Sequence, residues 1–178
     1  AFALPGGYMA LHTGLILKAD RPEEVLGVMA HELAHVTEQH SLRVLIKQAG
    51  IGIIMSMALG DFAALAGQAQ GLLNLKFSRN HETEADTVGF HTLERANIDP
   101  KGMIDFFDKI KQEHEGEGVS MDGALSILST HPATDDRIEN LNHLIKTEAK
   151  GPPYRDMDLN FREFQDMLRA QLESPESK

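Results

Sequence analysis

Cysteine is absent from this chain of 178 residues. That absence excludes disulfide bonds and thiolate metal ligands, so any bound metal ion would have to be held by histidine, aspartate or glutamate. It is also compatible with an oxidising compartment but does not establish one. The length suits one domain with a sizeable hydrophobic core.

Positive charge and long apolar runs are both scarce. Seventeen lysines and arginines stand against 27 aspartates and glutamates, which gives a formal net charge of −10 and argues against nucleic acid as a partner. The most apolar stretch, residues 51–75, is interrupted by glycines and by Asp61. It therefore lacks the about 20 apolar residues of a membrane-spanning helix. We expect a buried or amphipathic helical hairpin there; the alternative is a hairpin that associates with a membrane or an envelope protein.

The chain contains no internal repeat and no low-complexity segment. It opens with Ala1 rather than Met, so we expect an upstream segment that this sequence does not include. Residues 1–150 are predicted to form the main domain. Residues 151–178 are predicted to add a C-terminal helix that packs on this domain or extends from it. The oligomeric state leaves no signal in the sequence.

A short motif within the run from Val28 to Val36 carries the clearest chemistry. It reads His-Glu-Leu-Ala-His, from His31 to His35, and the run holds no proline or glycine. Residues four apart share one face of a helix, so both rings can reach one metal ion, and the carboxylate of Glu32 can act as general base. Apolar neighbours should seat this face against the core, which disfavours a surface helix with two solvated histidines. These neighbours are Val25, Leu26, Met29, Leu33 and Val36.

The pattern of the remaining chain predicts a mainly helical α+β fold with a small sheet edge near the N-terminus. Residues 1–20 read as extended, with a β-rich strand at 8–17. Asp20 is predicted to cap the helix that carries the motif, which should run to about Ser41 or as far as Lys47. Further helices are predicted at about residues 79–96, 100–115, 135–149 and 159–172.

A catalytic zinc site needs a third protein ligand and an open position for water. Glu82 and Asp86 lie four residues apart on a predicted helix. Glu82 can bind the metal, and Asp86 can accept the free N–H of a ligand histidine. His81 is a rival ligand, but it would leave the spacing of the two acids without a role. Glu84 would point elsewhere and be solvated. Without the first motif, an acidic helix start stabilised by the helix dipole would be the preferred interpretation.

The two motifs in this order resemble the gluzincin pattern of thermolysin-like enzymes. The local sequence is closer to one branch, the HtpX/BepA-like and CAAX-prenyl-protease-like zinc metallopeptidases, and most similar to soluble, periplasmic BepA-like members. This resemblance implies a periplasmic or cell-envelope location. The matching pieces follow the same order and extend over most of the chain. They are residues 1–7, 13–15 and 31–36, Ser78-Arg79 with residues 82–86, and Ser129-Thr130-His131-Pro132 with Arg137.

The resemblance implies a zincin (gluzincin) metallopeptidase fold that binds one Zn²⁺ ion. His31, His35 and Glu82 would be the metal ligands. Glu32 would be the catalytic base, and Asp86 would be the partner of a ligand histidine.

The resemblance also implies roles for two residues near the end of the matching region. His131 would lie near the metal, where it either stabilises the oxyanion or acts as a removable fourth ligand that keeps the enzyme latent. Arg137 would support the same region. Judged from the residues alone, a histidine before a proline is as readily an ordinary loop residue.

The predicted activity is hydrolysis of peptide bonds by a zinc-dependent endopeptidase. A polypeptide substrate would pair with the predicted strand along Tyr8, Ala10, His12 and Gly14, His12 being a strand residue rather than a metal ligand. Such backbone pairing has weak sequence preference and suits unfolded or misassembled envelope proteins. Two other classes stay open. The chain could be a latent or inactive zinc-containing, chaperone-like binding module that docks clients on residues 51–75, or a helical structural protein with a chance motif.

Overall fold

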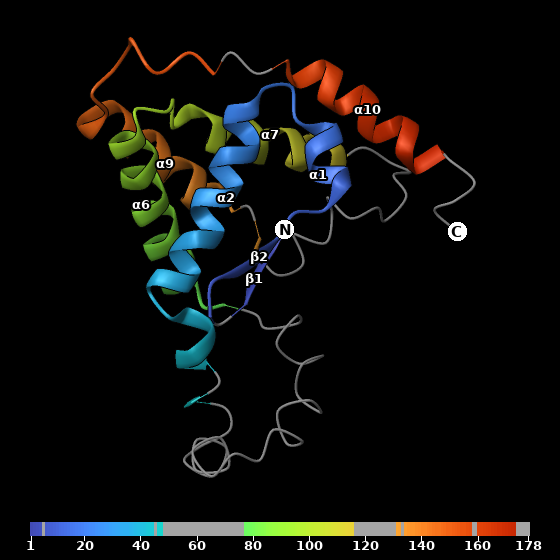
Figure 1. The fold of residues 1–178 in the computed structure, drawn as a ribbon. Helices are drawn as coiled ribbons and strands as arrows, with labels where there is room; N and C mark the ends of the chain where they lie inside the picture. Colours follow the sequence, from blue (N-terminus) through green and yellow to red (C-terminus); the bar gives the residue numbers. More distant parts are fainter. Residues whose placement is uncertain are drawn as a thin grey trace, which may run out of the picture.

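The computed structural model describes residues 1–4, 6–44, 46–47, 77–115, 131–132, 134–157 and 160–173. Within these residues the predicted mainly helical fold with a small N-terminal sheet is confirmed (Figure 1). Strands β1 (Phe2–Leu4) and β2 (Tyr8–Ala10) pair antiparallel, with Phe2 opposite Ala10 and Leu4 opposite Tyr8. The helices are α1 (Thr13–Lys18), α2 (Pro22–Thr37), α6 (Arg79–Ala96), α7 (Lys101–Glu115), α9 (Asp135–Glu148) and α10 (Phe161–Glu173). The predicted hairpin at 51–75 lies outside the described residues.

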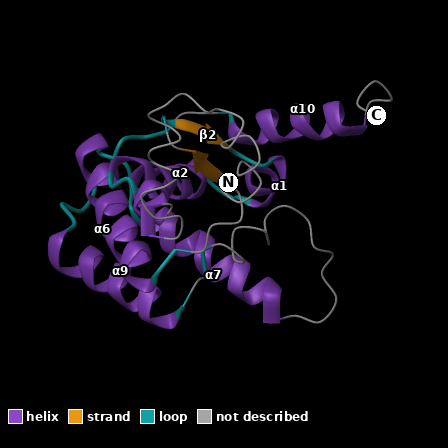
Figure 2. Ribbon diagram, turned by 90° about the horizontal axis from the view of Figure 1, so that it is seen from below, coloured by secondary structure: helices purple, strands orange, loops and turns teal. Residues whose placement is uncertain are grey.

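Helix α2 is the central element of the fold. It packs against α6 and α7, and α9 packs against the same two helices, while β1 lies on α2 and α10 contacts α1 (Figures 1 and 2). The core consists of two clusters of buried side chains on either side of α2. The first contains Ala1, Leu15, Ala19, Val25, Val28 and Phe106, and the second contains Ala30, Phe90, Leu93, Met103, Ile104, Phe107 and Leu141.

The start of α2 differs by one residue from the prediction. Arg21, rather than Asp20, takes the N-cap position, because Pro22 occupies the first helical turn with its φ already suited to a helix. Asp20 still belongs to the helix start, since its backbone N–H donates to the carboxylate of Glu24 at 3.3 Å.

The predicted end of α2 is wrong. The helix stops at Thr37, because Gln39 adopts a left-handed conformation with φ of 56°, and a separate helical segment begins at His40. Leu33 also departs from the predicted apolar face and is 41% exposed. The motif therefore lies on the last two turns of a helix that ends just beyond it.

Helix α6 approaches α2 closely at Gly89. A Cβ atom at this position would stand 3.2 Å from the backbone nitrogen of His31, so the absence of a side chain allows the two backbones to meet. Ser78 caps α6, accepting a hydrogen bond from the backbone N–H of His81 at 3.3 Å. One face of the helix is buried along its length and turns toward α2. It comprises Glu82, Ala85, Asp86, Gly89, Phe90 and Leu93.

The predicted strand at 8–17 is wrong beyond Ala10. Residues Thr13–Lys18 form α1 instead, and its Leu15 is fully buried. Leu11, Leu15 and Ala19 are spaced by four and all pack in the first core cluster, which is a helical period. Gly14 is therefore a helix residue and not a bulge in a strand.

The C-terminal part is tied to the helices through buried polar groups. Glu94 of α6, which is 5% exposed, accepts hydrogen bonds from the backbone N–H of Lys150 and from the hydroxyl of Tyr154. Gln165 of α10 donates to the backbone oxygens of Ile16 and Ala19. No helix within the described residues is long and apolar enough to cross a membrane.

Candidate metal centre

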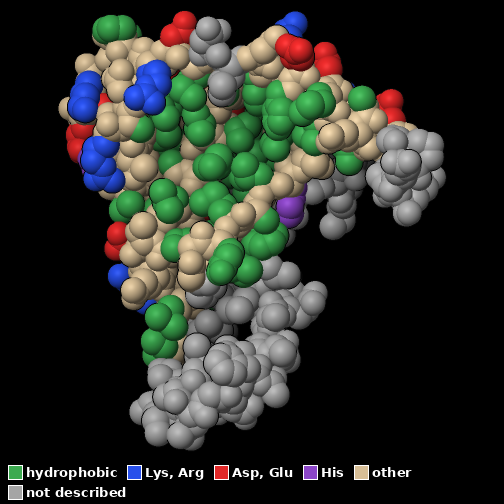
Figure 3. Space-filling view, in the orientation of Figure 1, with side chains coloured by type: hydrophobic (Ala, Val, Ile, Leu, Met, Phe, Trp, Pro, Cys, Tyr) green, Lys and Arg blue, Asp and Glu red, His purple; other side chains and the backbone are tan. Residues whose placement is uncertain are grey.

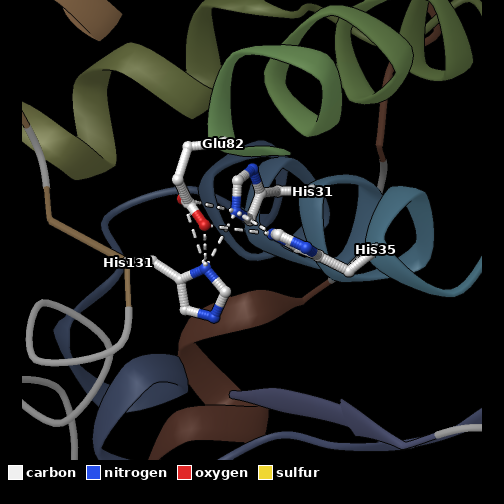
Figure 4. Close-up of side chains that lie close together, drawn as sticks. All are labelled: His31, His35, Glu82 and His131. Carbon is white, nitrogen blue, oxygen red and sulfur yellow. Dashed lines mark hydrogen bonds and ion pairs between the residues drawn. The ribbon is translucent and has the colours of Figure 1, made fainter. Parts of the chain in front are cut away.

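Four donor groups from three separate stretches of the chain converge beneath the surface. They belong to His31 and His35 on α2, Glu82 on α6 and His131, and all four side chains are buried and point toward one another (Figure 4). Nε2 of His31 lies 3.0 Å from Nε2 of His35 and 3.3 Å from Nδ1 of His131. The Glu82 carboxylate lies 3.1 Å from His131 Nδ1, 3.4 Å from His31 Nε2 and 3.5 Å from His35 Nε2.

Several of these separations are close to the edges of a tetrahedral metal site, and one donor atom from each of the four side chains lies within 4.8 Å of the others. Zinc bonds of about 2.0–2.2 Å in tetrahedral geometry place neighbouring donor atoms about 3.3–3.6 Å apart. The donor atoms lie 3.0–3.5 Å from one another in the contacts given above. The four donor side chains are buried. In keeping with this, the face drawn in Figure 3 exposes little histidine surface, and hydrophobic side chains gather in its middle. The four side chains can therefore hold a metal ion, and imidazole and carboxylate groups are among the donors that zinc accepts.

The charge around the donors also favours a divalent cation. Three carboxylates are buried here, those of Glu32, Glu82 and Asp86, and Arg137 is the one buried basic side chain beside them among the described residues. With neutral imidazoles this leaves two uncompensated negative charges in a region of low dielectric. Buried charges are costly unless they are paired or bound to a metal, and one divalent cation would balance this cluster.

Asp86 lies behind the ring of His31, beside the ring nitrogen that faces away from the other donors. Nδ1 of His31 lies 2.9 Å from Oδ1 of Asp86, which directs Nε2 toward the other donors. Burial alone would lower the pKa of His31, but the hydrogen bonds with Asp86 and Glu82 outweigh it and raise the pKa to about 9. Without a metal ion, the site therefore favours another positive charge, a proton, on this ring.

Arg137 of α9 closes the acidic side of the site. Its Nε and Nη2 each donate to Asp86 at 2.7 Å, and Nη1 lies 2.9 Å from the Glu82 carboxylate. Burial would raise the pKa of Asp86, but these contacts and that of His31 lower it, so Asp86 stays ionised. The guanidinium lies over the ring of Phe107 at 4.7 Å. Arg137 therefore holds the Asp86 carboxylate through two donors.

Glu32 is placed beside the donors without belonging to them. It is 2% exposed, and its Oε1 has no hydrogen-bond partner among the described residues. Nε2 of His131 lies 3.6 Å from this oxygen. A buried carboxylate oxygen without a partner is costly, so this atom is suited to accept a hydrogen bond from a water molecule or a substrate.

Two residues beside the centre were not identified from the sequence. His40, which is fully buried, lies 2.9 Å from Nδ1 of His35 through its own Nδ1. Phe77 lies against the rings of His35 and His131, with centroid separations of 4.1 and 5.3 Å. The available signals were a third histidine five residues after His35 and an aromatic residue directly before the cap of α6.

The other acidic and basic candidates lie away from the donors. His81, the rival ligand, stacks on His40 with ring centroids 4.5 Å apart and does not join the cluster. Glu84 is 42% exposed as expected, but it also bonds His40 at 3.0 Å.

The four residues predicted to bind substrate do not share one strand. Tyr8 and Ala10 lie on β2, with Tyr8 75% exposed, whereas His12 takes the N-cap position of α1 and Gly14 lies within that helix. A cavity of about 380 Å³ opens between the β1–β2 hairpin and the end of α2. Its lining includes Leu4, Gly6, Gly7, His35, Val36 and Leu42.

The chain matches known proteins along most of its length. A model of peptidase family M48 matches residues 1–145. The beta-barrel assembly-enhancing protease of Escherichia coli is 31% identical over 154 residues, which are 78% of this chain and 30% of that protein. A Vibrio cholerae protein provisionally given the same name is 36% identical over 78% of this chain and 31% of its own length.

One of the relatives is named as a mitochondrial protein. The mitochondrial metalloendopeptidase OMA1 of Saccharomyces cerevisiae is 32% identical over 80% of this chain and 42% of its own length. The chain thus spans between about a third and a half of the length of these relatives. The family model and the relatives confirm the resemblance drawn from the sequence: the chain belongs to peptidase family M48.

Proposed function

We propose that the chain is a zinc metalloendopeptidase domain that hydrolyses peptide bonds in unfolded or misassembled envelope proteins. The position of Glu32 carries this proposal: its buried carboxylate borders a cluster of four metal donors, and one of its oxygens has no hydrogen-bond partner in the part of the chain that the structure describes. The charge balance of the cluster supports a divalent ion, and the relatives are named as proteases.

In the proposed reaction each residue acts through the atom that faces the centre. His31, His35 and Glu82 would hold the ion. When bound, zinc lowers the pKa of water and polarises the scissile carbonyl. Glu32 would accept the proton of the attacking water through Oε1 and return it to the leaving amine. Asp86 would keep His31 in the tautomer that presents Nε2, and its charge would be balanced by Arg137.

His131 has two candidate roles, and its position favours one of them. Its Nδ1 lies 3.1 Å from Glu82 and 3.3 Å from His31 Nε2, within the donor set itself. A ring in that place would take the position that a catalytic zinc keeps open for water. We therefore infer a latent arrangement in which His131 is a removable fourth ligand. If the ring moved away, the same side chain would be available to stabilise the oxyanion.

The substrate would bind as an extended chain along the β1–β2 hairpin. Strand addition on β2 would involve Tyr8 and Ala10, and the cavity beside His35 would accept an apolar side chain against Leu4 and Val36. His12 is the N-cap residue of α1 and Gly14 lies within that helix. These two residues could therefore contact the substrate only from outside the strand.

An envelope location is part of the proposal. It is supported by the relatives named for enhancing beta-barrel assembly, while OMA1 is named as mitochondrial. Association with a membrane or an envelope protein through residues 51–75 remains a prediction, and so does any oligomeric state.

The test is cleavage of an unfolded protein such as casein by the zinc-loaded chain, beside Glu32→Gln at equal zinc content. We expect the variant to lose activity by about 10²- to 10⁴-fold, because a general base contributes about this factor. Glu23→Gln is the matched control, since it makes the same change in the first turn of the same helix. Full activity of Glu32→Gln would refute the proposed mechanism.

Inactivity of the wild-type chain with zinc bound would direct the test to His131→Ala. Activity that appears in this variant would support latency. A zinc-containing binding module, the alternative drawn from the sequence, would instead bind unfolded clients equally well as the wild type and as Glu32→Gln, and neither form would cleave them. The relatives, which are named as proteases, lend that alternative no support.

A further inference from the structure

The outer nitrogen of His35 faces a second histidine rather than a carboxylate. His35 Nδ1 lies 2.9 Å from Nδ1 of His40, and the two rings cross at 73°. Nε2 of His40 lies 3.0 Å from Oε2 of Glu84. His40 is fully buried, whereas Glu84 is 42% exposed. The three side chains thus lead from the donor cluster to the edge of the protein.

The hydrogens in this series determine one another. If His35 presents the lone pair of Nε2 to a metal ion, its Nδ1 must carry the hydrogen and donate it. Nδ1 of His40 must then accept, which leaves the hydrogen of His40 on Nε2. That hydrogen points at the Glu84 carboxylate, which can only accept. Each donor in the series therefore has one acceptor, and no buried N–H is left over.

The end of α2 creates this contact. On a continuous helix, a residue five positions later would lie about 140° around the axis from His35. The left-handed Gln39 ends the helix and starts a new segment at His40, whose ring turns back onto His35. His81 of α6 stacks on His40 with an interplanar angle of 20° and holds the ring in place.

The two α2 histidines are therefore supported in different ways. His31 reaches the carboxylate of Asp86 directly at 2.9 Å, whereas His35 reaches that of Glu84 through His40. Histidine ligands of metal ions usually donate their second N–H to such an oriented partner, and loss of the partner weakens metal binding.

We propose that His40 is a positioning residue for His35: with Glu84 as its acceptor, it sets the tautomer and ring orientation in which His35 Nε2 faces the metal. This inference rests on the metal-binding function proposed above. Arg43, on the same helical segment as His40, lies 3.3 Å from Glu84 and keeps that carboxylate in place. The role belongs to His40 and Glu84 together, since neither alone completes the series.

The test measures metal binding rather than activity. His40→Phe keeps a ring but removes the acceptor, and His40→Gln restores an acceptor oxygen on a flexible side chain. We expect zinc affinity, measured by competition with a chromophoric chelator, to fall about 10- to 100-fold in His40→Phe. His40→Gln should recover most of this loss. The visible absorption of the Co²⁺-loaded protein should change in His40→Phe and return toward the wild-type spectrum in His40→Gln.

Three comparisons separate this role from packing and from failure of the site. His91→Gln, at a half-exposed position on α6, should match the wild type. If His40→Phe does not fold by circular dichroism, Glu84→Ala decides, because it removes the final acceptor at a half-exposed position. If His40→Phe folds and keeps the zinc affinity and the Co²⁺ spectrum of the wild type, the proposal is overturned. If His40→Phe does not fold, the same result in Glu84→Ala overturns it. Equal losses of zinc affinity in His40→Phe and His40→Gln would also overturn it. Absence of stoichiometric zinc in the wild type would instead refute the metal site itself.

Discussion

Replacing Arg137 by methionine tests whether the buried charges of the centre depend on one guanidinium. The arginine side chain is 5% exposed and makes two 2.7 Å hydrogen bonds to Asp86 and a 2.9 Å contact with Glu82. Methionine preserves much of the apolar part of the side chain. It leaves His31 as the one ionisable side chain that contacts Asp86 among the described residues. Removing one member of a buried ion pair costs about 3–5 kcal/mol.

This loss would be a large share of the stability of a domain, which is typically about 5–15 kcal/mol. We expect the free energy of unfolding of metal-free Arg137→Met, measured by urea denaturation, to fall by about 3–5 kcal/mol. Adding Asp86→Asn removes the orphaned charge, so the double variant should be more stable than the sum of the two single effects predicts. Arg95→Met, at an exposed position on α6, should stay within about 0.5 kcal/mol of the wild type.

Two results would refute this reasoning. A loss below about 1 kcal/mol in Arg137→Met would mean that the pairing is worth no more than a surface ion pair. Additivity of the two single variants would mean that Arg137 and Asp86 act independently, since coupled residues deviate by about 0.5–3 kcal/mol.

Three further perturbations address the metal, the helix contact and the core. Removal of the metal with a chelator should lower the melting temperature in differential scanning calorimetry, because binding to the folded state alone stabilises it; an unchanged value would contradict the site. Gly89→Val should lower both the free energy of unfolding, by about 1–3 kcal/mol, and zinc affinity, because its Cβ would stand 3.2 Å from the His31 backbone; unaltered zinc affinity would show that α6 can move without disturbing the donors. Leu15→Ala should cost about 2–5 kcal/mol in urea denaturation while zinc affinity is retained, since Leu15 is fully buried in the cluster away from the centre; a mild loss would mean that the cavity collapses.

Much of the centre could be predicted from the sequence because its parts are local. His31 and His35 lie one helical turn apart, as do Glu82 and Asp86, and each pair takes its geometry from a single helix. Gly89 explains why the two helices meet at these residues, but a glycine in a sequence does not identify the backbone that it contacts. The position of Arg137 on both acids depends on the packing of α9 and could be expected only through the family resemblance.

The predictions that the structure contradicts, and the residue that the sequence did not identify, depend on tertiary packing in the same way. Leu11, Leu15 and Ala19 repeat every four residues, yet the β-prone side chains around Gly14 favoured a strand. His40 was overlooked because a continuous helix would have turned it away from His35. The residue that changes this is Gln39, whose left-handed conformation depends on how α2 ends in the folded protein rather than on its own intrinsic preference.

The distances along the chain between the parts of the centre determine when it can exist during synthesis. Asp86 follows His31 by 55 residues, and His131 follows it by 100. A ribosome that has released only α2 has made the catalytic motif but none of the groups that hold it in order. Arg137 emerges last, 51 residues after the aspartate that it neutralises. If the proposed function holds, a nascent chain therefore has no assembled peptidase site with which to cut itself or its neighbours until α9 has folded back onto α6.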